Sequence, residues 1–168
     1  PSDIDWVVYI DSSAAVNVNL ATGKGSGGDA QDDVILNMEA IEGSKFGDYL
    51  VGDDFANTIA GMAGADKMFG GAGRDWLDYF TSPAAVKIDL ASGIGSGGDA
   101  KGDKFSGFES VVGSRFKDTL LGNSGGNWLE GNAGADMLDG RKGFDVLDYY
   151  DSAKGVSINL AKGTASGG

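Results

Sequence analysis

Glycine recurs at every ninth position in two stretches of the chain, and this rhythm limits the possible folds more than any other feature. From Gly43 the residues read GSKFGDYLV, GDDFANTIA, GMAGADKMF and GGAGRDWLD. From Gly113 they read GSRFKDTLL, GNSGGNWLE, GNAGADMLD and GRKGFDVLD. One large aliphatic residue in nine, at position eight, is too few for an amphipathic helix, which needs three or four per two turns. The rhythm therefore predicts short strands joined by glycine-rich turns.

Such a pattern predicts an all-β solenoid. A six-residue turn precedes a three-residue strand, of which only the middle side chain points inward. Two nines form one flattened coil with a strand on each side, and stacked coils form two parallel sheets. Because one coil cannot bury its core alone, stability must come from stacking. The predicted core residues of this ladder are Leu50, Ile59, Met68, Leu77, Leu120, Leu129, Leu138 and Leu147.

A longer repeat encloses the nines, because similar segments begin at Tyr9, Tyr79 and Tyr149, 70 residues apart. Between the nonapeptide blocks lie spacers. In the second spacer VKIDL predicts a longer strand, ASGIGSGGDAKGD a loop, and FSGFESVV a return to the sheet; the residues leave open whether a spacer forms two or three half-coils. We expect a window on a longer tandem array. The predicted units are the end of a preceding repeat (1–8), repeat 1 (9–78, spacer 9–42, nonapeptides 43–78), repeat 2 (79–148, spacer 79–112, nonapeptides 113–148) and the start of repeat 3 (149–168).

Composition excludes several classes of function. The 168 residues include no Cys and no His, which excludes disulfides, thiolate metal sites and imidazole-based catalysis. Lys plus Arg is 13 and Asp plus Glu is 25, and a net charge of −12 argues against nucleic-acid binding. No apolar run reaches the length of a membrane span. The acids recur evenly along the chain rather than at one spot, so we expect no catalytic site.

The nines that begin at Gly61, Gly70, Gly131 and Gly140 are closest to the pattern G-G-x-G-x-D-x-U-x, with U a large aliphatic residue. The chain thus resembles the RTX, or hemolysin-type, calcium-binding repeat proteins. The resemblance implies a parallel β-roll that binds several calcium ions in its turns. The metal-binding residues that it implies are Asp48, Asn57, Gly61, Gly64, Asp66, Gly70, Gly73, Asp75, Asp118, Asn127, Gly131, Gly134, Asp136, Gly140, Gly143 and Asp145.

In this family the ion lies between turns stacked on one edge. That rule pairs Asp48 with Asp66, Asn57 with Asp75, Asp118 with Asp136 and Asn127 with Asp145. Calcium takes oxygen ligands, and glycine turns can present backbone carbonyls beside the carboxylates. The turns of Asp66, Asp75, Asp136 and Asp145 rank first, because Phe46, Phe55 and Phe116 replace a glycine in three of the others.

The alternative for all these Asp and Asn residues is turn capping by hydrogen bonds to nearby N–H groups. Glu39 and Glu109 are in phase with the sixth positions but lack the glycine turn. A solvated or N–H-bonded carboxylate is the better interpretation there. For Asp29, Asp33, Asp99 and Asp103, ordinary loop hydrogen bonding is preferred to a further ion.

The resemblance implies secretion to the outside or the surface of a Gram-negative bacterium. The first functional hypothesis is a non-enzymatic, calcium-stabilised module of an adhesin, surface layer or extracellular filament. The second is a carboxy-terminal secretion and folding module of an enzyme such as a protease, lipase or alginate epimerase. A carbohydrate-active β-helix is a distant third. Outward apolar residues favour self-association or contact with neighbouring repeats, unless spacers cover them: Tyr49, Phe69, Trp76, Leu121, Trp128 and Met137.

Overall fold

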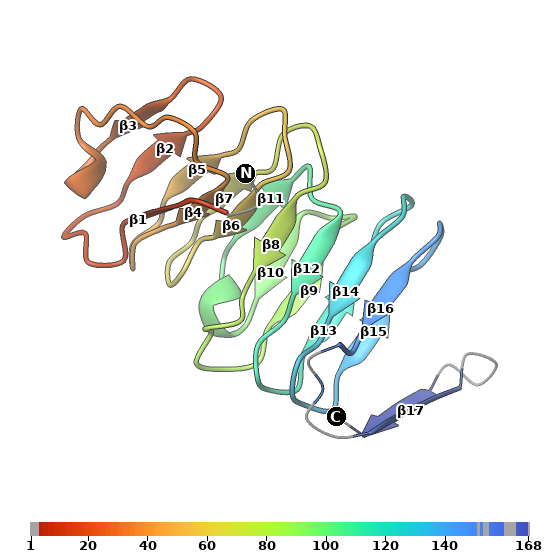
Figure 1. Ribbon diagram of the computed structural model, residues 1–168. Coiled ribbons are helices and arrows are strands. Elements are labelled where there is room, and N and C mark those ends of the chain that lie inside the picture. Colours follow the sequence, from red (N-terminus) through yellow and green to blue (C-terminus); the bar gives the residue numbers. More distant parts are fainter. Residues whose placement is uncertain (1–3, 151, 153–154, 160–163, 168) are drawn as a thin grey trace.

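The computed structural model of the chain describes residues 4–150, 152, 155–159 and 164–167, and nearly all its regular elements are strands. Two sheets run along the long axis, from β1–β3 at one end to β15 and β16 at the other (Figure 1). Sheet A is parallel throughout. Its strands, in spatial order, are β1 (Trp6–Val8), β4 (Ala40–Glu42), β6 (Thr58–Ala60), β8 (Trp76–Asp78), β12 (Ser110–Val112), β14 (Trp128–Glu130) and β16 (Val146–Asp148).

Sheet B has nine strands and contains both parallel and antiparallel pairs. Two short 3-10 turns, η1 (Gly28–Ala30) and η2 (Gly98–Ala100), follow its β3 and β10 strands. In spatial order the strands are β3 (Lys24–Ser26), β2 (Asn17–Asn19), β5 (Tyr49–Val51), β7 (Lys67–Phe69), β11 (Lys104–Ser106), β10 (Ile94–Ser96), β9 (Lys87–Asp89), β13 (Thr119–Leu121) and β15 (Met137–Asp139).

The nonapeptide blocks fold as the rhythm predicts. Each three-residue strand occupies positions seven to nine, and its partner in the same sheet is the strand two nines away, as in the register of Ile59 with Leu77. The middle residues Leu50, Ile59, Met68 and Leu77 are fully buried, whereas Leu138 near the end of the ladder is only partly buried. Each buried aliphatic side chain contributes about 1.5–3 kcal/mol, so stability accumulates coil by coil. The all-β, parallel β-roll prediction is confirmed.

The spacer between the two blocks corrects two expectations. The segment VKIDL forms only the three-residue strand β9, no longer than its neighbours. The predicted loop contains strand β10, which pairs antiparallel with β9 and β11, and the turn η2. Because β11 pairs with β7 and β9 with β13, this three-stranded meander is inserted into sheet B, while β12 alone continues sheet A beside β8. The spacer thus adds three strands to sheet B and one to sheet A.

Core packing explains why β10 escaped prediction. Its inward position is Gly95, and a Cβ there would lie 2.8 Å from the carbonyl oxygen of Ala100 and 3.1 Å from its Cβ. Ala100 in η2 is fully buried and fills the space that a strand side chain would otherwise occupy. Because glycine is depleted in strands, the glycine at this inward position prevents β10 from being predicted as a strand from the sequence.

Part of the predicted third repeat lies outside the described residues. Its described part contains β17 (Val156–Asn159) and β18 (Thr164–Gly167), which form an antiparallel pair, as β9 and β10 do.

Positions seven and nine point outward, as expected. In sheet A the register places Ser110 between Trp76 and Trp128, whose ring centroids are 5.8 Å apart. Ser110 is fully buried beneath them, and its hydroxyl has no hydrogen-bond partner. Of the strands in this spacer, β9, β10 and β11 lie in sheet B and β12 is itself part of sheet A, so none of them covers this face.

Replacing Ser110 by Ala should leave stability unchanged or raise it by about 1 kcal/mol, because it removes a buried hydroxyl without a partner and keeps the shape of the site. The equivalent residue one repeat earlier is already Ala40. Urea unfolding of the two proteins in calcium measures the difference. A loss of stability would mean that the hydroxyl has an interaction absent from this account.

Candidate metal-binding turns

Two edges of the roll carry the nonapeptide turns. Edge 1 holds the turns that lead into sheet B, and edge 2 holds those that lead into sheet A. The structure brings together each predicted pair of sixth-position residues through a hydrogen bond from a backbone N–H to a carboxylate. On edge 1 the N–H groups of Asp48 and Asp118 donate to Oδ1 of Asp66 and Asp136, at 2.8 and 2.9 Å. On edge 2 those of Asn57 and Asn127 donate to Oδ1 of Asp75 and Asp145, at 2.8 and 2.9 Å.

Each pair combines two kinds of turn. The first kind, the capped turns, begins at Gly43, Gly52, Gly113 and Gly122 and is closed by its own side chains. Ser44 Oγ accepts from the N–H of Phe46 at 3.1 Å, and Asp48 Oδ2 accepts from the N–H of Ser44. Asn57 Oδ1 accepts from the N–H of Asp53 at 2.7 Å, in the same way. In these turns the side-chain oxygens of the sixth residue already accept hydrogen bonds from backbone N–H groups.

The second kind, the open turns, begins at Gly61, Gly70, Gly131 and Gly140. Their second and fourth residues have positive φ, for example 65° at Met62 and 151° at Gly64. A Cβ at Gly64 would lie 2.5 Å from the carbonyl oxygen of Phe46 and 2.7 Å from Asp66 Oδ1. Only glycine permits this approach, which places a main-chain carbonyl of the capped turn against the open turn stacked on it.

The open turns also hold carboxylate oxygens without partners. Asp66 and Asp75 are fully buried, and Oδ2 of each has no hydrogen bond. A buried, unpaired carboxylate oxygen is costly and is a ligand that calcium prefers. No group of three or more acidic side chains among the described residues forms a metal cage by itself. A calcium site here therefore needs backbone carbonyls, and the glycine turns bring these close. The residues present fit the ion.

Burial raises the pKa values of these carboxylates. Burial is the main cause at Asp66, whose pKa rises to about 8 despite the hydrogen bond from the Asp48 N–H, with the charges of Asp103 and Asp48 adding to the rise. The pKa of Asp75 rises to about 6, again through burial first and then the charge of Glu109. At neutral pH the Asp66 carboxyl group is therefore largely protonated without calcium, whereas the Asp75 carboxyl group is largely ionised.

These shifts predict how pH affects the stability of the calcium-free chain. A carboxyl group whose pKa is higher when folded than when unfolded favours the folded state while it is protonated. Its contribution falls as pH rises from about 4, the unfolded pKa, toward 6 for Asp75 and 8 for Asp66. We expect the chain in chelator to show a thermal unfolding transition at pH 5 that shifts to lower temperature as pH rises and is lost near neutral pH. A rise over that range would contradict the burial of these groups.

Acidic residues outside the nonapeptides continue the hydrogen-bonded ladder. Glu109 Oε2 accepts from the N–H of Asp75 at 3.0 Å, as the N–H-bonded interpretation predicts. Asp103 Oδ1 accepts from the N–H of Asp66 at 2.8 Å, and its Oδ2 accepts from the Tyr79 hydroxyl at 2.8 Å. Sequence reasoning placed Asp103 in a loop and missed this role. The signal was the repeated Tyr–Asp spacing, since Tyr9 binds Asp33 in the same way at 2.7 Å.

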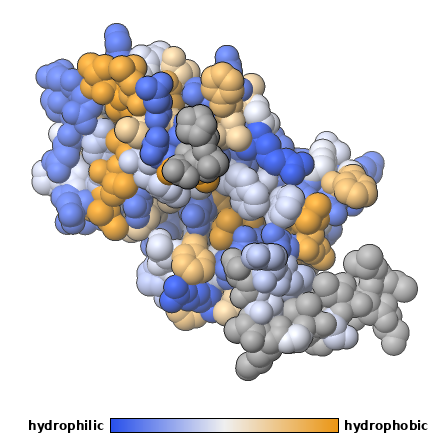
Figure 2. All heavy atoms as spheres, in the orientation of Figure 1, coloured by the Kyte–Doolittle hydropathy of each residue, from blue (hydrophilic) through white to orange (hydrophobic). Residues whose placement is uncertain are grey.

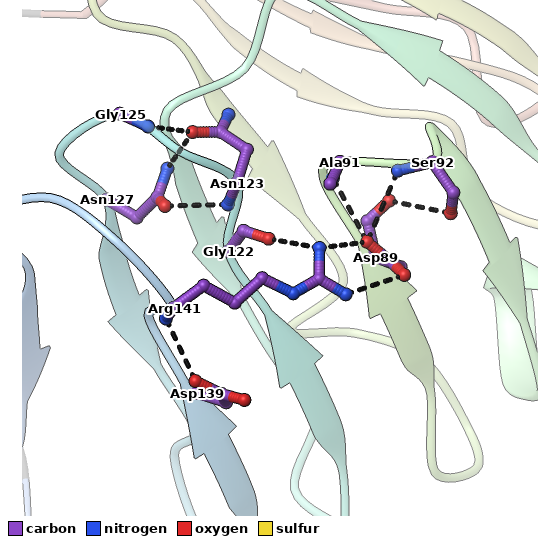
Figure 3. A network of polar contacts seen from close by, with 9 residues as sticks. All are labelled: Asp89, Ala91, Ser92, Gly122, Asn123, Gly125, Asn127, Asp139 and Arg141. Carbon is purple, nitrogen blue, oxygen red and sulfur yellow. Dashed lines mark hydrogen bonds and ion pairs between the residues drawn. The ribbon is translucent and has the colours of Figure 1, made fainter.

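Arg141 occupies the second position of the last open turn and joins that turn to the spacer (Figure 3). Its guanidinium makes two hydrogen bonds to Asp89, at 2.8 and 2.9 Å, and one to the carbonyl oxygen of Gly122 at 2.7 Å. The hydrogen bond from Arg141 lowers the pKa of Asp89. The predicted calcium residues of this turn, Gly140, Gly143 and Asp145, thus belong to a coil tied to strand β9.

Comparison with known families identifies the repeats. The model of the RTX calcium-binding nonapeptide repeat matches residues 42–77 and 112–147. A search of curated proteins finds no match. No helix among the described residues is long and apolar enough to cross a membrane. The matched residues are the stacked capped and open turns and their strands, so these two blocks of the chain are RTX calcium-binding nonapeptide repeats.

Proposed function

We propose that the chain is a calcium-stabilised structural repeat module of a secreted or cell-surface bacterial protein, of the adhesin, surface-layer or filament type. The observation that carries this proposal is the buried, unpartnered Oδ2 atom of Asp66 and of Asp75, each in an open glycine turn. Calcium supplies the counter-charge that these carboxylates lack.

The open turns are the proposed principal ligands, through the carboxylates of Asp66, Asp75, Asp136 and Asp145 and the carbonyls of their glycine segments. Each proposed site also includes the sixth residue of the capped turn stacked on the open turn: Asp48, Asn57, Asp118 or Asn127. Their hydrogen bonds hold the capped turn in position, and their main chains orient the neighbouring carboxylate. Stacking thus converts a sequence repeat into a row of oxygen-lined sites.

Charge and location support the same proposal. A chain of net charge −12 repels itself when its carboxylates are stacked, and each ion bound to the folded state offsets two charges and adds binding free energy. Extracellular calcium modules bind with dissociation constants of about 0.1–1 mM, so such a chain would fold outside the cell rather than in the cytosol. The enzyme-attached secretion module remains the alternative, since it would use the same calcium mechanism.

Native mass spectrometry combined with limited proteolysis tests the proposal. The chain should carry more than one calcium ion and resist cleavage in calcium, and chelator should expose cleavage sites throughout the nonapeptide blocks. A chain that binds no ion, or is cleaved equally in both conditions, would contradict it. Magnesium at the same concentration is the control, because it retains its water shell and needs octahedral geometry.

A further inference from the structure

The outer faces of the two sheets differ in charge. In sheet A the charged residues at the outward strand positions are all acidic: Glu42, Asp78, Glu130 and Asp148. In sheet B they include four lysines, Lys24, Lys67, Lys87 and Lys104, and only two aspartates, Asp89 and Asp139. Asp89 is already paired with Arg141. The overall charge of −12 conceals a basic face opposite an acidic one.

Among the residues that the structure describes, the lysines of sheet B form no ion pair with a carboxylate. Lys67 and Lys104 are directly opposite each other on neighbouring parallel strands, and both are exposed. Like charges in this position destabilise a sheet. Within the described part of the chain, neither forms an ion pair with a carboxylate. The two adjacent lysines thus form a patch of positive charge that has no paired carboxylate among the described residues.

Both faces also expose apolar side chains. Trp6 and Val8 in sheet A are 41% and 48% exposed, and Tyr49 and Met137 in sheet B are 42% and 56% exposed. Figure 2 shows hydrophobic groups separated by hydrophilic ones on the face seen there. Apolar groups among charged residues are typical of protein interfaces and would remain uncovered beneath a soluble polyanion.

We propose that the acidic face of sheet A in one copy docks on the basic face of sheet B in a second copy. The occupant is a second copy because this chain supplies both complementary faces, whereas contact between two identical faces would oppose like charges. Such a contact is heterologous, so each copy keeps one unused face and the assembly can grow beyond a dimer. The inference rests on the proposed function in one respect: the faces exist only in the calcium-folded chain.

Analytical ultracentrifugation in calcium, over a range of protein concentrations, tests the proposal. The wild-type chain should form a concentration-dependent series of oligomers that high salt weakens by screening. Lys67→Glu/Lys104→Glu, which alters only sheet B, and Glu42→Lys, which alters only sheet A, should each weaken association at least tenfold. Lys101→Glu/Lys117→Glu, which makes the same charge change outside the strands, should associate like wild type.

The decisive experiment mixes the Lys67→Glu/Lys104→Glu variant with the Glu42→Lys variant. The unaltered sheet A of the lysine variant meets the unaltered sheet B of the Glu42→Lys variant, so the mixture should form dimers and stop there. Association that is unaffected by either variant, or a wild-type chain that stays monomeric while it folds, would overturn the proposal. So would a monomer whose Lys67 and Lys104 retain it on immobilised heparin, which would assign the basic face to a polyanion. Circular dichroism of each sample separates these outcomes from a failure to fold with calcium.

Discussion

The double substitution Asp66→Asn/Asp75→Asn should raise the calcium concentration at the folding midpoint by about tenfold or more, since calcium affinity depends on the number of charged ligands. Both carboxylates are buried in open turns, and each has an oxygen without a partner. In chelator the effect should be different. The variant should lose much of the decline in stability between pH 5 and pH 8, because the two groups with pKa values of about 8 and 6 no longer titrate.

A charge-matched control separates ligand loss from a change in net charge. Asp11→Asn/Asp54→Asn also removes two negative charges, and both residues are exposed. This control should leave the calcium midpoint nearly unchanged. If the two double variants shifted the midpoint equally, the buried carboxylates would be no more than part of a diffuse negative field, and the open turns would not be the ligands.

Replacing Ile59 by Ala should lower the free energy of unfolding in calcium by about 2–5 kcal/mol. Ile59 is fully buried and lies in register between Ile41 and Leu77 on the neighbouring strands of sheet A. Each strand contributes one inward residue to the core, so a cavity there interrupts the contact between successive coils. Urea unfolding monitored by circular dichroism measures the loss.

The matched comparison is Ile94→Ala, the same change on the outer face of sheet B, where Ile94 is 55% exposed. It should alter stability by no more than about 0.5 kcal/mol. Equal losses in the two variants would mean that the inward aliphatic ladder does not dominate the stability of the roll.

The nonapeptide blocks were predictable because the residues that form each turn and the residue that fills the core recur together in every nine. Gly61 and Gly64 supply the turn, Asp66 its carboxylate and Met68 the core, all at fixed spacing. The same pattern indicated that the turns beginning at Gly61, Gly70, Gly131 and Gly140 differ from the others. In the structure, these four turns have positive φ at their second and fourth residues.

The spacer was less predictable because tertiary packing decides its structure. Strand β10 carries Gly95 where a strand would normally carry an aliphatic residue, and Ala100 from η2, the turn that follows β10, completes the core. The role of Asp103 depends on Asp66, 37 residues away, and on the Tyr79 hydroxyl. Such contacts produce no nine-residue periodicity within one 70-residue repeat. In the sequence they can be recognised only because the same residue types recur in the other repeat.

Far-UV circular dichroism during a calcium titration at neutral pH, starting from chelated protein, tests the central claim most directly. Calcium should produce a cooperative gain of β structure with a midpoint in the range of about 0.1–1 mM, and magnesium should not reproduce it. Full β structure in chelator at neutral pH, unchanged by calcium, would contradict the account.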